Sequence, residues 1–93
     1  MFYTISKLVV EDYEKFKSDW DASLELRKMG GQKSFAIYQT IEDPNTIVLF
    51  MGWNAEDVAK MFMESPLLQD FLKGAGVKDY ETWFANESEK GEL

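Results

Sequence analysis

The 93-residue sequence contains no cysteine and no histidine. Without cysteine there is no disulfide framework, thiol nucleophile or thiolate metal ligand, and without histidine the commonest general base and metal ligand are missing as well. The acidic residues of the first expected helix do not supply a metal site instead, because helical spacing spreads them over a solvated face. We therefore expect no metal and no cofactor, and most familiar catalytic machinery is excluded.

Basic residues are also few, since ten lysines and arginines stand against 17 acids for a net charge of −7. This charge repels phosphate backbones and anionic lipid headgroups, so we expect neither nucleic acid nor a membrane as a partner. No segment approaches the roughly 20 apolar residues of a transmembrane helix, and the N-terminus lacks the pattern of a secretory signal. The sequence thus indicates a soluble, cytoplasmic protein.

What the chain does have is enough apolar material for a core. Hydrophobic residues make up 45% of the sequence and aromatic residues 15%, which excludes a disordered chain. A chain of 93 residues forms one domain at most, and such a domain buries only about 60 to 65% of its unfolded surface. We expect a single domain over residues 1–86 and an acidic tail over 87–93.

The run 46–53 is the starting point for the fold prediction, because its apolar, glycine and aromatic residues follow one another without alternation. A strand of this kind has to be covered on both faces. Other strand patterns span 2–10, 32–41 and 77–85, and helix patterns span 12–29 and 54–74. The resulting order of elements is β-α-β-β-α-β.

Residue types at the helix ends support these boundaries. Asp12 and Asn54 are expected N-caps. Gly30 and Gly31 follow the first helix, as the left-handed C-terminal turn requires. Ser65 is expected to cap a fresh turn with Pro66 at its first helical position, which splits the second helix.

This order of elements predicts an α+β, ferredoxin-like fold, in which a four-stranded antiparallel sheet carries both helices on one face. The other sheet face is then bare, although neither side of the strand 46–53 is polar. We expect a second copy of the chain to cover it, which gives a homodimeric α/β barrel. Alternation does not decide which face meets the helices, because both are apolar.

Several short segments carry a family resemblance. They are the residues 9–13, 26–31, 43–45, 49–53 and 65–68, which include the Asp-Pro-Asn turn, the Gly-Trp end of the buried strand and the Ser-Pro break. With them, nearly the whole chain resembles the dimeric α/β-barrel superfamily. Within it, the chain is most similar to antibiotic-biosynthesis-monooxygenase-like domains, many of them of uncharacterised function.

The resemblance implies different chemistries for different members. Haem-degrading members use a histidine and a tryptophan on the second helix and an asparagine on the first strand. The corresponding positions here are Leu72, Phe62 and Ser6 or Lys7, so haem cleavage is disfavoured. Cofactor-independent monooxygenases of the family hold an acidic phenol in a dry pocket with residues such as Asn, Trp, Tyr and Arg. This chain has those residue types, without a diagnostic spacing.

Family members place ligands between the sheet and the helices, and six residues are candidates for that pocket. Arg27 shares the aromatic stripe of the first helix and suits an anionic ligand, but it also suits a cation that extends to water or pairs locally. Lys7 is a candidate base if desolvated, and otherwise a charge that protects an exposed strand. The aromatic candidates are equally suited to the core or a dimer interface; they are Trp20, Tyr38, Trp53 and Phe62.

Three functions remain open. We favour a dimeric protein that binds a small apolar or aromatic molecule, because the usual catalytic residues are missing. The alternative is a cofactor-independent monooxygenase or isomerase that acts on an aromatic, polyketide-like substrate. A structural oligomer is a further alternative, based on the apolar patch of Ala22, Leu26 and Met29 on the outer face of the first helix. Whether the protein is an enzyme is not decided by the sequence.

Overall fold

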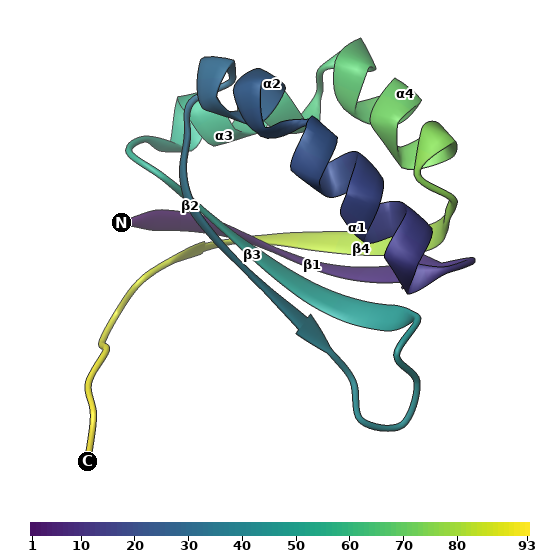
Figure 1. Ribbon diagram of the computed structural model, residues 1–93. Helices are drawn as coiled ribbons and strands as arrows, with labels where there is room; N and C mark the ends of the chain where they lie inside the picture. The colour runs from purple at the N-terminus through teal and green to yellow at the C-terminus, as the bar shows by residue number, and fades with distance from the viewer.

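The computed structural model describes residues 1–93, and all helices lie on one face of a single sheet (Figure 1). The sheet is antiparallel, with the strand order β2-β3-β1-β4. Its strands are β1 (Phe2–Val10), β2 (Gln32–Gln39), β3 (Thr46–Trp53) and β4 (Val77–Asn86). The helices are α1 (Tyr13–Ala22), α2 (Leu24–Met29), α3 (Glu56–Met63) and α4 (Pro66–Gly74). The ferredoxin-like α+β fold is confirmed.

Both expected helices are divided in two. The break at Ser65 is confirmed, because its Oγ accepts a hydrogen bond from the Leu67 amide at 3.2 Å and Pro66 opens α4. The expectation of one continuous helix over 12–29 was wrong. Ser23 leaves the helical conformation, and its Oγ donates to the carbonyl oxygen of Trp20 at 2.7 Å. Such a local bond competes with the helical pattern, so α1 ends there and α2 begins.

The helix N-termini differ from the expected capping. Asp12 occupies the N-cap position of α1, but its side chain makes no capping bond. Instead the Tyr13 amide donates to Asn45 Oδ1 at 2.9 Å, which ties the β2–β3 turn to α1. The expected cap at Asn54 was wrong, since Ala55 is the N-cap of α3 and Asn54 is exposed. Glu56 in the first turn still suits the positive end of the helix dipole.

The helix-facing side of the sheet, which we call the inner face, holds the core. The odd-numbered residues of β3 all point inward and are buried: Ile47, Leu49, Met51 and Trp53. Phe16 and Trp20 of α1 pack with them in one apolar cluster. Trp53 is fully buried, its ring lies 5.1 Å from that of Phe62, and its Nε1 donates to Thr4 Oγ1 at 3.1 Å. The structure thereby decides which face of β3 meets the helices.

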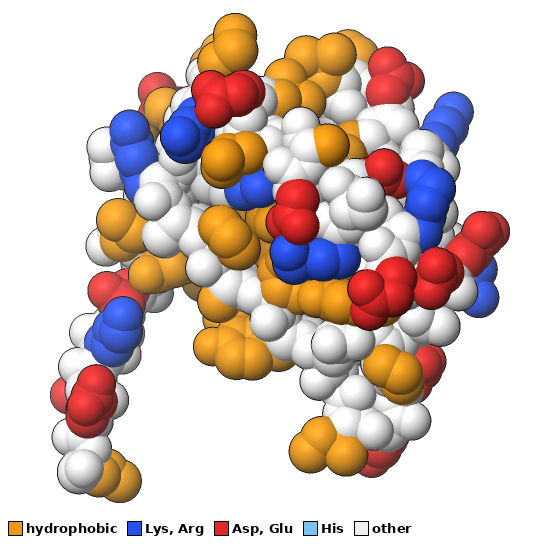
Figure 2. All heavy atoms as spheres, viewed as in Figure 1, with side chains coloured by type: hydrophobic (Ala, Val, Ile, Leu, Met, Phe, Trp, Pro, Cys, Tyr) orange, Lys and Arg blue, Asp and Glu red, His pale blue; other side chains and the backbone are white.

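No helix covers the opposite side of the sheet, the outer face. Tyr38 and Trp83 remain 58% and 51% exposed there. Figure 2 shows hydrophobic side chains beneath the sheet, between the C-terminal tail and the β2–β3 turn. Lys7 of β1 lies opposite Glu81 of β4 on this face. None of the helices has the length and apolar character needed to cross a membrane.

Candidate functional site

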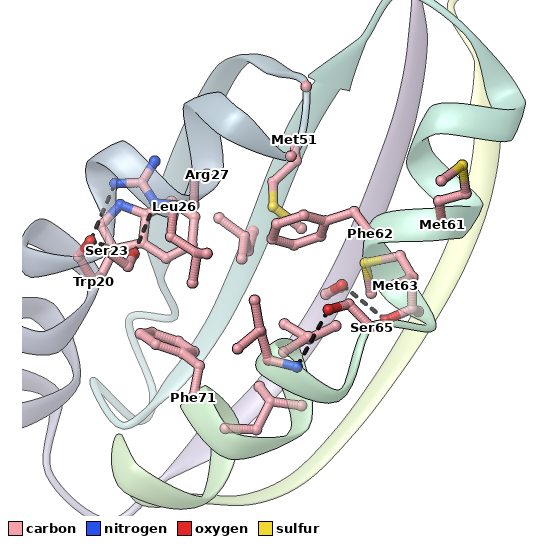
Figure 3. A pocket seen from close by; sticks show the side chains of 18 of the residues that line it. Trp20, Ser23, Leu26, Arg27, Met51, Met61, Phe62, Met63, Ser65 and Phe71 are labelled. Carbon is pink, nitrogen blue, oxygen red and sulfur yellow. Dashed lines mark hydrogen bonds between the residues drawn. The ribbon is translucent and has the colours of Figure 1, made fainter.

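A cavity of about 490 Å³ lies between the inner face of the sheet and the helices. Sixteen of its 23 lining residues are hydrophobic. Figure 3 shows Trp20, Ser23 and Arg27 at one end, where α1 meets α2, and Met63 and Ser65 at the other, where α3 meets α4. Volume and composition are those of a site for a small, mainly apolar molecule.

The floor of the cavity comes from inward-pointing residues of the sheet. Leu8, Leu49 and Met51 supply apolar surface, and Ser6 and Thr82 supply a pair of hydroxyl groups. Ser6 Oγ and Thr82 Oγ1 are 2.9 Å apart, on directly opposed positions of β1 and β4. Each hydroxyl can donate one hydrogen bond and accept others. The floor therefore offers one polar contact point within an apolar surface.

Methionines are frequent in the cavity lining, and two of them lie at its open side. Four of the five methionines line it, namely Met29, Met51, Met61 and Met63. Met29 and Met61 are 85% and 73% exposed although they line the cavity, so it opens to solvent between α2 and α3. Unbranched thioether side chains adapt easily to different shapes. The opening can therefore fit ligands of varied outline.

The two glycines after α2 let side chains of α3 pack closely against the end of α2. A Cβ at position 30 would collide with the Phe62 ring, and one at position 31 would lie 2.5 Å from a methyl carbon of Val58. Gly31 also has a φ of 96°, which favours glycine. The Gly30-Gly31 pair thus ends the helix, as expected from the sequence, and also makes room for two cavity-lining side chains.

Arg27 is the charged residue that lines the cavity, and its guanidinium group donates hydrogen bonds to three different residues. Its Nε donates to Ser23 Oγ at 2.9 Å, its Nη1 to Gln32 Oε1 at 2.7 Å and its Nη2 to the Trp20 carbonyl oxygen at 3.1 Å. The guanidinium carbon lies 3.8 Å from the centre of the Trp20 ring. Burial lowers the pKa of Arg27, and the negative charge of Asp21 opposes this effect in part.

The structure brings three of the six candidate residues to the cavity and places three elsewhere. Arg27, Trp20 and Phe62 line it. Trp53 is on the inner face but is buried beneath Phe62, outside the cavity wall.

Lys7 and Tyr38 lie on the outer face of the sheet, on the side away from the cavity. Both face the surface that we expected a second copy of the chain to cover. Lys7 and Tyr38 therefore cannot contact a ligand in this cavity, which the sequence-based prediction required.

Sequence reasoning missed the hydroxyl pair and the opening of the cavity between α2 and α3. The signal for the first was present, because Thr4 and Ser6 interrupt the inner face of β1 at alternate positions. Its partner Thr82 depends on the register of β1 with β4, which local sequence does not give. Leu26 and Met29, assigned to an outer patch, line the cavity because the break at Ser23 divides the helix.

The chain has the ferredoxin-like fold of antibiotic biosynthesis monooxygenase proteins, over almost its whole length. SnoaB, a cofactor-independent oxygenase from Streptomyces nogalater, matches with a TM-score of 0.80 at 11% identity, over 96% of this chain and 94% of SnoaB. A candidate antibiotic biosynthesis monooxygenase from Bordetella bronchiseptica matches with a TM-score of 0.76 at 18% identity, over 92% of this chain and 95% of its own.

A similar candidate from Deinococcus radiodurans matches with a TM-score of 0.67 at 12% identity, over 100% of this chain and 98% of its own. No protein-family model and no curated protein sequence matches the chain. The resemblance stated from the sequence is confirmed for the fold.

Proposed function

We propose that the protein binds a small apolar or aromatic molecule in the cavity between the inner face of the sheet and the helices. The cavity itself is the observation that carries the proposal. Its volume of about 490 Å³ falls within the range of sites for small ligands. Its few polar groups are separated, with the Ser6–Thr82 hydroxyl pair on the floor and Arg27 in the wall.

Filling the cavity tests this proposal. Leu68 is half-buried and lines it, so Leu68→Trp inserts an indole into the binding space, whereas Leu24→Trp adds the same side chain at an exposed position outside it. We expect the neutral fluorescent probe N-phenyl-1-naphthylamine to bind the unmodified protein with one-to-one stoichiometry. Leu68→Trp should weaken that binding about tenfold or more, and Leu24→Trp should not. Equal affinity of both variants would contradict binding in the cavity.

A homodimer is part of the same proposal, with a second copy of the chain covering the outer face. This face combines exposed aromatic side chains with Lys7 and Glu81 on neighbouring strands. A surface that carries both charges suits a two-fold axis, because each copy can offer its acid to the partner's base. Sedimentation equilibrium should give a dimer at micromolar concentration.

A cofactor-independent oxygenase is a second candidate function. It is supported by the shared fold with SnoaB, together with a mainly apolar cavity that suits a phenolic or polyketide-like substrate. An oxygen electrode with anthrones and naphthols as substrates provides the test. Oxygen uptake that Leu68→Trp abolishes and Leu24→Trp preserves would support oxygenation, and a lack of uptake across such a panel would leave binding as the function.

A further inference from the structure

Arg27 is a buried cation without an acidic partner. It is the chain's one arginine, and its side chain belongs to a residue only 4% exposed. All four ion pairs of the protein join surface lysines to acids, and none involves Arg27. A buried charge is usually paired, because removal from water is costly for it. The positive charge at this end of the cavity therefore has no ion-pair partner within the chain, although the more distant charge of Asp21 acts on it.

The residues around Arg27 add further hydrogen-bond donors. Two buried side-chain atoms in the protein lack a hydrogen-bond partner, Trp20 Nε1 and Gln32 Nε2, and both are donors. Each belongs to a residue that Arg27 contacts directly. Arg27 itself has five N–H groups and uses three. This donor cluster of Trp20, Arg27 and Gln32 thus has a surplus of N–H groups and a positive charge.

The donor cluster is also rigid and reaches the cavity. Trp20 and Arg27 both line it, as Figure 3 shows for the wall at the α1–α2 junction. The guanidinium is fixed by its three hydrogen bonds and lies over the ring of Trp20 at 3.8 Å and near that of Phe35 at 5.1 Å. A donor group that is already immobilised loses little conformational entropy when a ligand binds.

We propose that the cavity selects apolar molecules that carry one anionic oxygen group, such as a carboxylate, phenolate or sulfonate, held by Arg27 and Trp20 Nε1. This inference rests on the proposed binding function and specifies its ligand class. The net charge of −7 repels anions at long range, so a preference for an anion has to come from the donor cluster.

A purely structural role for Arg27 explains part of its surroundings. Its bonds to Ser23 and to the Trp20 carbonyl hold the break between α1 and α2, where a cation also suits the C-terminal end of α1. That role does not account for the buried, unpartnered indole N–H of Trp20, a residue that lines the cavity. The two roles differ in what they predict for ligand charge, and a matched pair of probes separates them.

The probes are 1-anilinonaphthalene-8-sulfonate and N-phenyl-1-naphthylamine, which share one aromatic skeleton and differ by the sulfonate. In fluorescence titrations of the unmodified protein, the sulfonate should bind at least tenfold more tightly. Arg27→Met should weaken the binding of the sulfonate by about 10- to 100-fold and change the affinity for the neutral probe by no more than about twofold. Lys28→Met is the control, because it makes the same charge change at an exposed neighbour on α2.

Each result has a defined meaning. Equal binding of both probes by the unmodified protein, or equal loss of both in Arg27→Met, overturns the anion preference and leaves cavity binding intact. Failure of the unmodified protein to bind either probe overturns cavity binding itself and the anion preference with it.

Trp20→Phe is a second variant in case Arg27→Met fails to fold, because it keeps Arg27, removes the indole N–H donor and leaves a smaller aromatic ring in its place. This variant should bind the sulfonate about threefold or more weakly, whereas its affinity for the neutral probe should not fall. An unchanged sulfonate affinity in this variant overturns the assignment of Trp20 Nε1. Near-ultraviolet circular dichroism shows for each variant that binding is measured on folded protein.

Discussion

The two faces of β3 are both apolar in sequence and differ in what covers them. Along β3, Ile47 and Leu49 point to the inner face and are buried, whereas Val48 and Phe50 point to the outer face and are only half-buried. The inner face meets four helices and a ligand-sized cavity, and the outer face meets nothing within the chain (Figure 1). One apolar strand thus packs against the helices on one side and leaves an apolar surface uncovered on the other, which is the surface proposed for association.

The largest expected effect compares the same substitution on both faces. Ile47 is fully buried on the inner face and Ile5 is half-buried on the outer face. Ile47→Ala should lower the free energy of unfolding by about 2 to 5 kcal/mol, because it leaves a cavity in the core. Ile5→Ala should cost less than half as much when urea unfolding is measured at protein concentrations below the dimer dissociation constant. Equal losses would mean that the outer face is as well packed as the inner one.

A charge in the middle of the outer face should separate association from folding. Phe50→Lys places an ammonium group beside Tyr38, whose ring centre lies 5.8 Å from that of Phe50. We expect the dimer dissociation constant to rise about 30-fold or more in sedimentation equilibrium. Ile41→Lys is the matched control, since Ile41 is fully exposed in the β2–β3 turn. An unchanged dimer dissociation constant in Phe50→Lys would show that the two copies associate through another surface.

A smaller effect is expected from the polar bond within the inner face. Thr4→Val removes the acceptor of the Trp53 indole N–H, which is fully buried. The unfolding free energy should fall by about 1 to 3 kcal/mol, because the donor stays buried without a partner. Thr46→Val is the control, since the bond of Thr46 to Asp43 is exposed and water can replace it. Similar losses in the two variants would argue against a special role for the buried bond.

The sequence predicted the fold well where local signals agree. The Ser-Pro break, the double glycine and the four strands all follow from residue types within a few positions of each other. The misses share a physical cause, which is contact between distant segments. Asn45 caps α1 from 32 positions away in the chain, and Ser6 meets Thr82 across 76. Neither partner is recognisable until the register of the sheet is known.

The candidate site was predictable to the same degree. Arg27, Trp20 and Phe62 follow from helical periodicity, which places residues on one face of a helix. Lys7 and Tyr38 lie away from the cavity because the choice between two apolar sheet faces depends on which one the helices cover. That choice is made by the whole fold, and the alternation of a single strand does not encode it.

The smallest expected effect lies at the edge of the inner face, where the cover becomes thin. Phe84 of β4 is 45% exposed there, and Lys60 Nζ of α3 lies 5.9 Å from its ring centre. Lys60 also pairs with Glu56 at 2.7 Å on the surface. The hydrogen bond to Glu56, followed by its charge, raises the pKa of Lys60 above its ordinary value of 10.5. Glu56→Gln should therefore lower the melting temperature, by only about 1 to 2 °C at pH 7.

The pH dependence of that small difference follows from the direction of the pKa shift. Because the pKa of Lys60 is raised in the folded state, the stabilisation is fully present below pH 10.5 and is lost as the pH rises through the raised value. Melting curves of the unmodified protein and Glu56→Gln should thus differ by a constant amount from pH 7 to 9 and approach each other at higher pH, where only the interaction of Glu56 with the α3 dipole remains. A difference that grows with pH would have the wrong sign for this pair. High salt should also reduce the difference in melting temperature, because the side chains of Lys60 and Glu56 are both exposed to solvent.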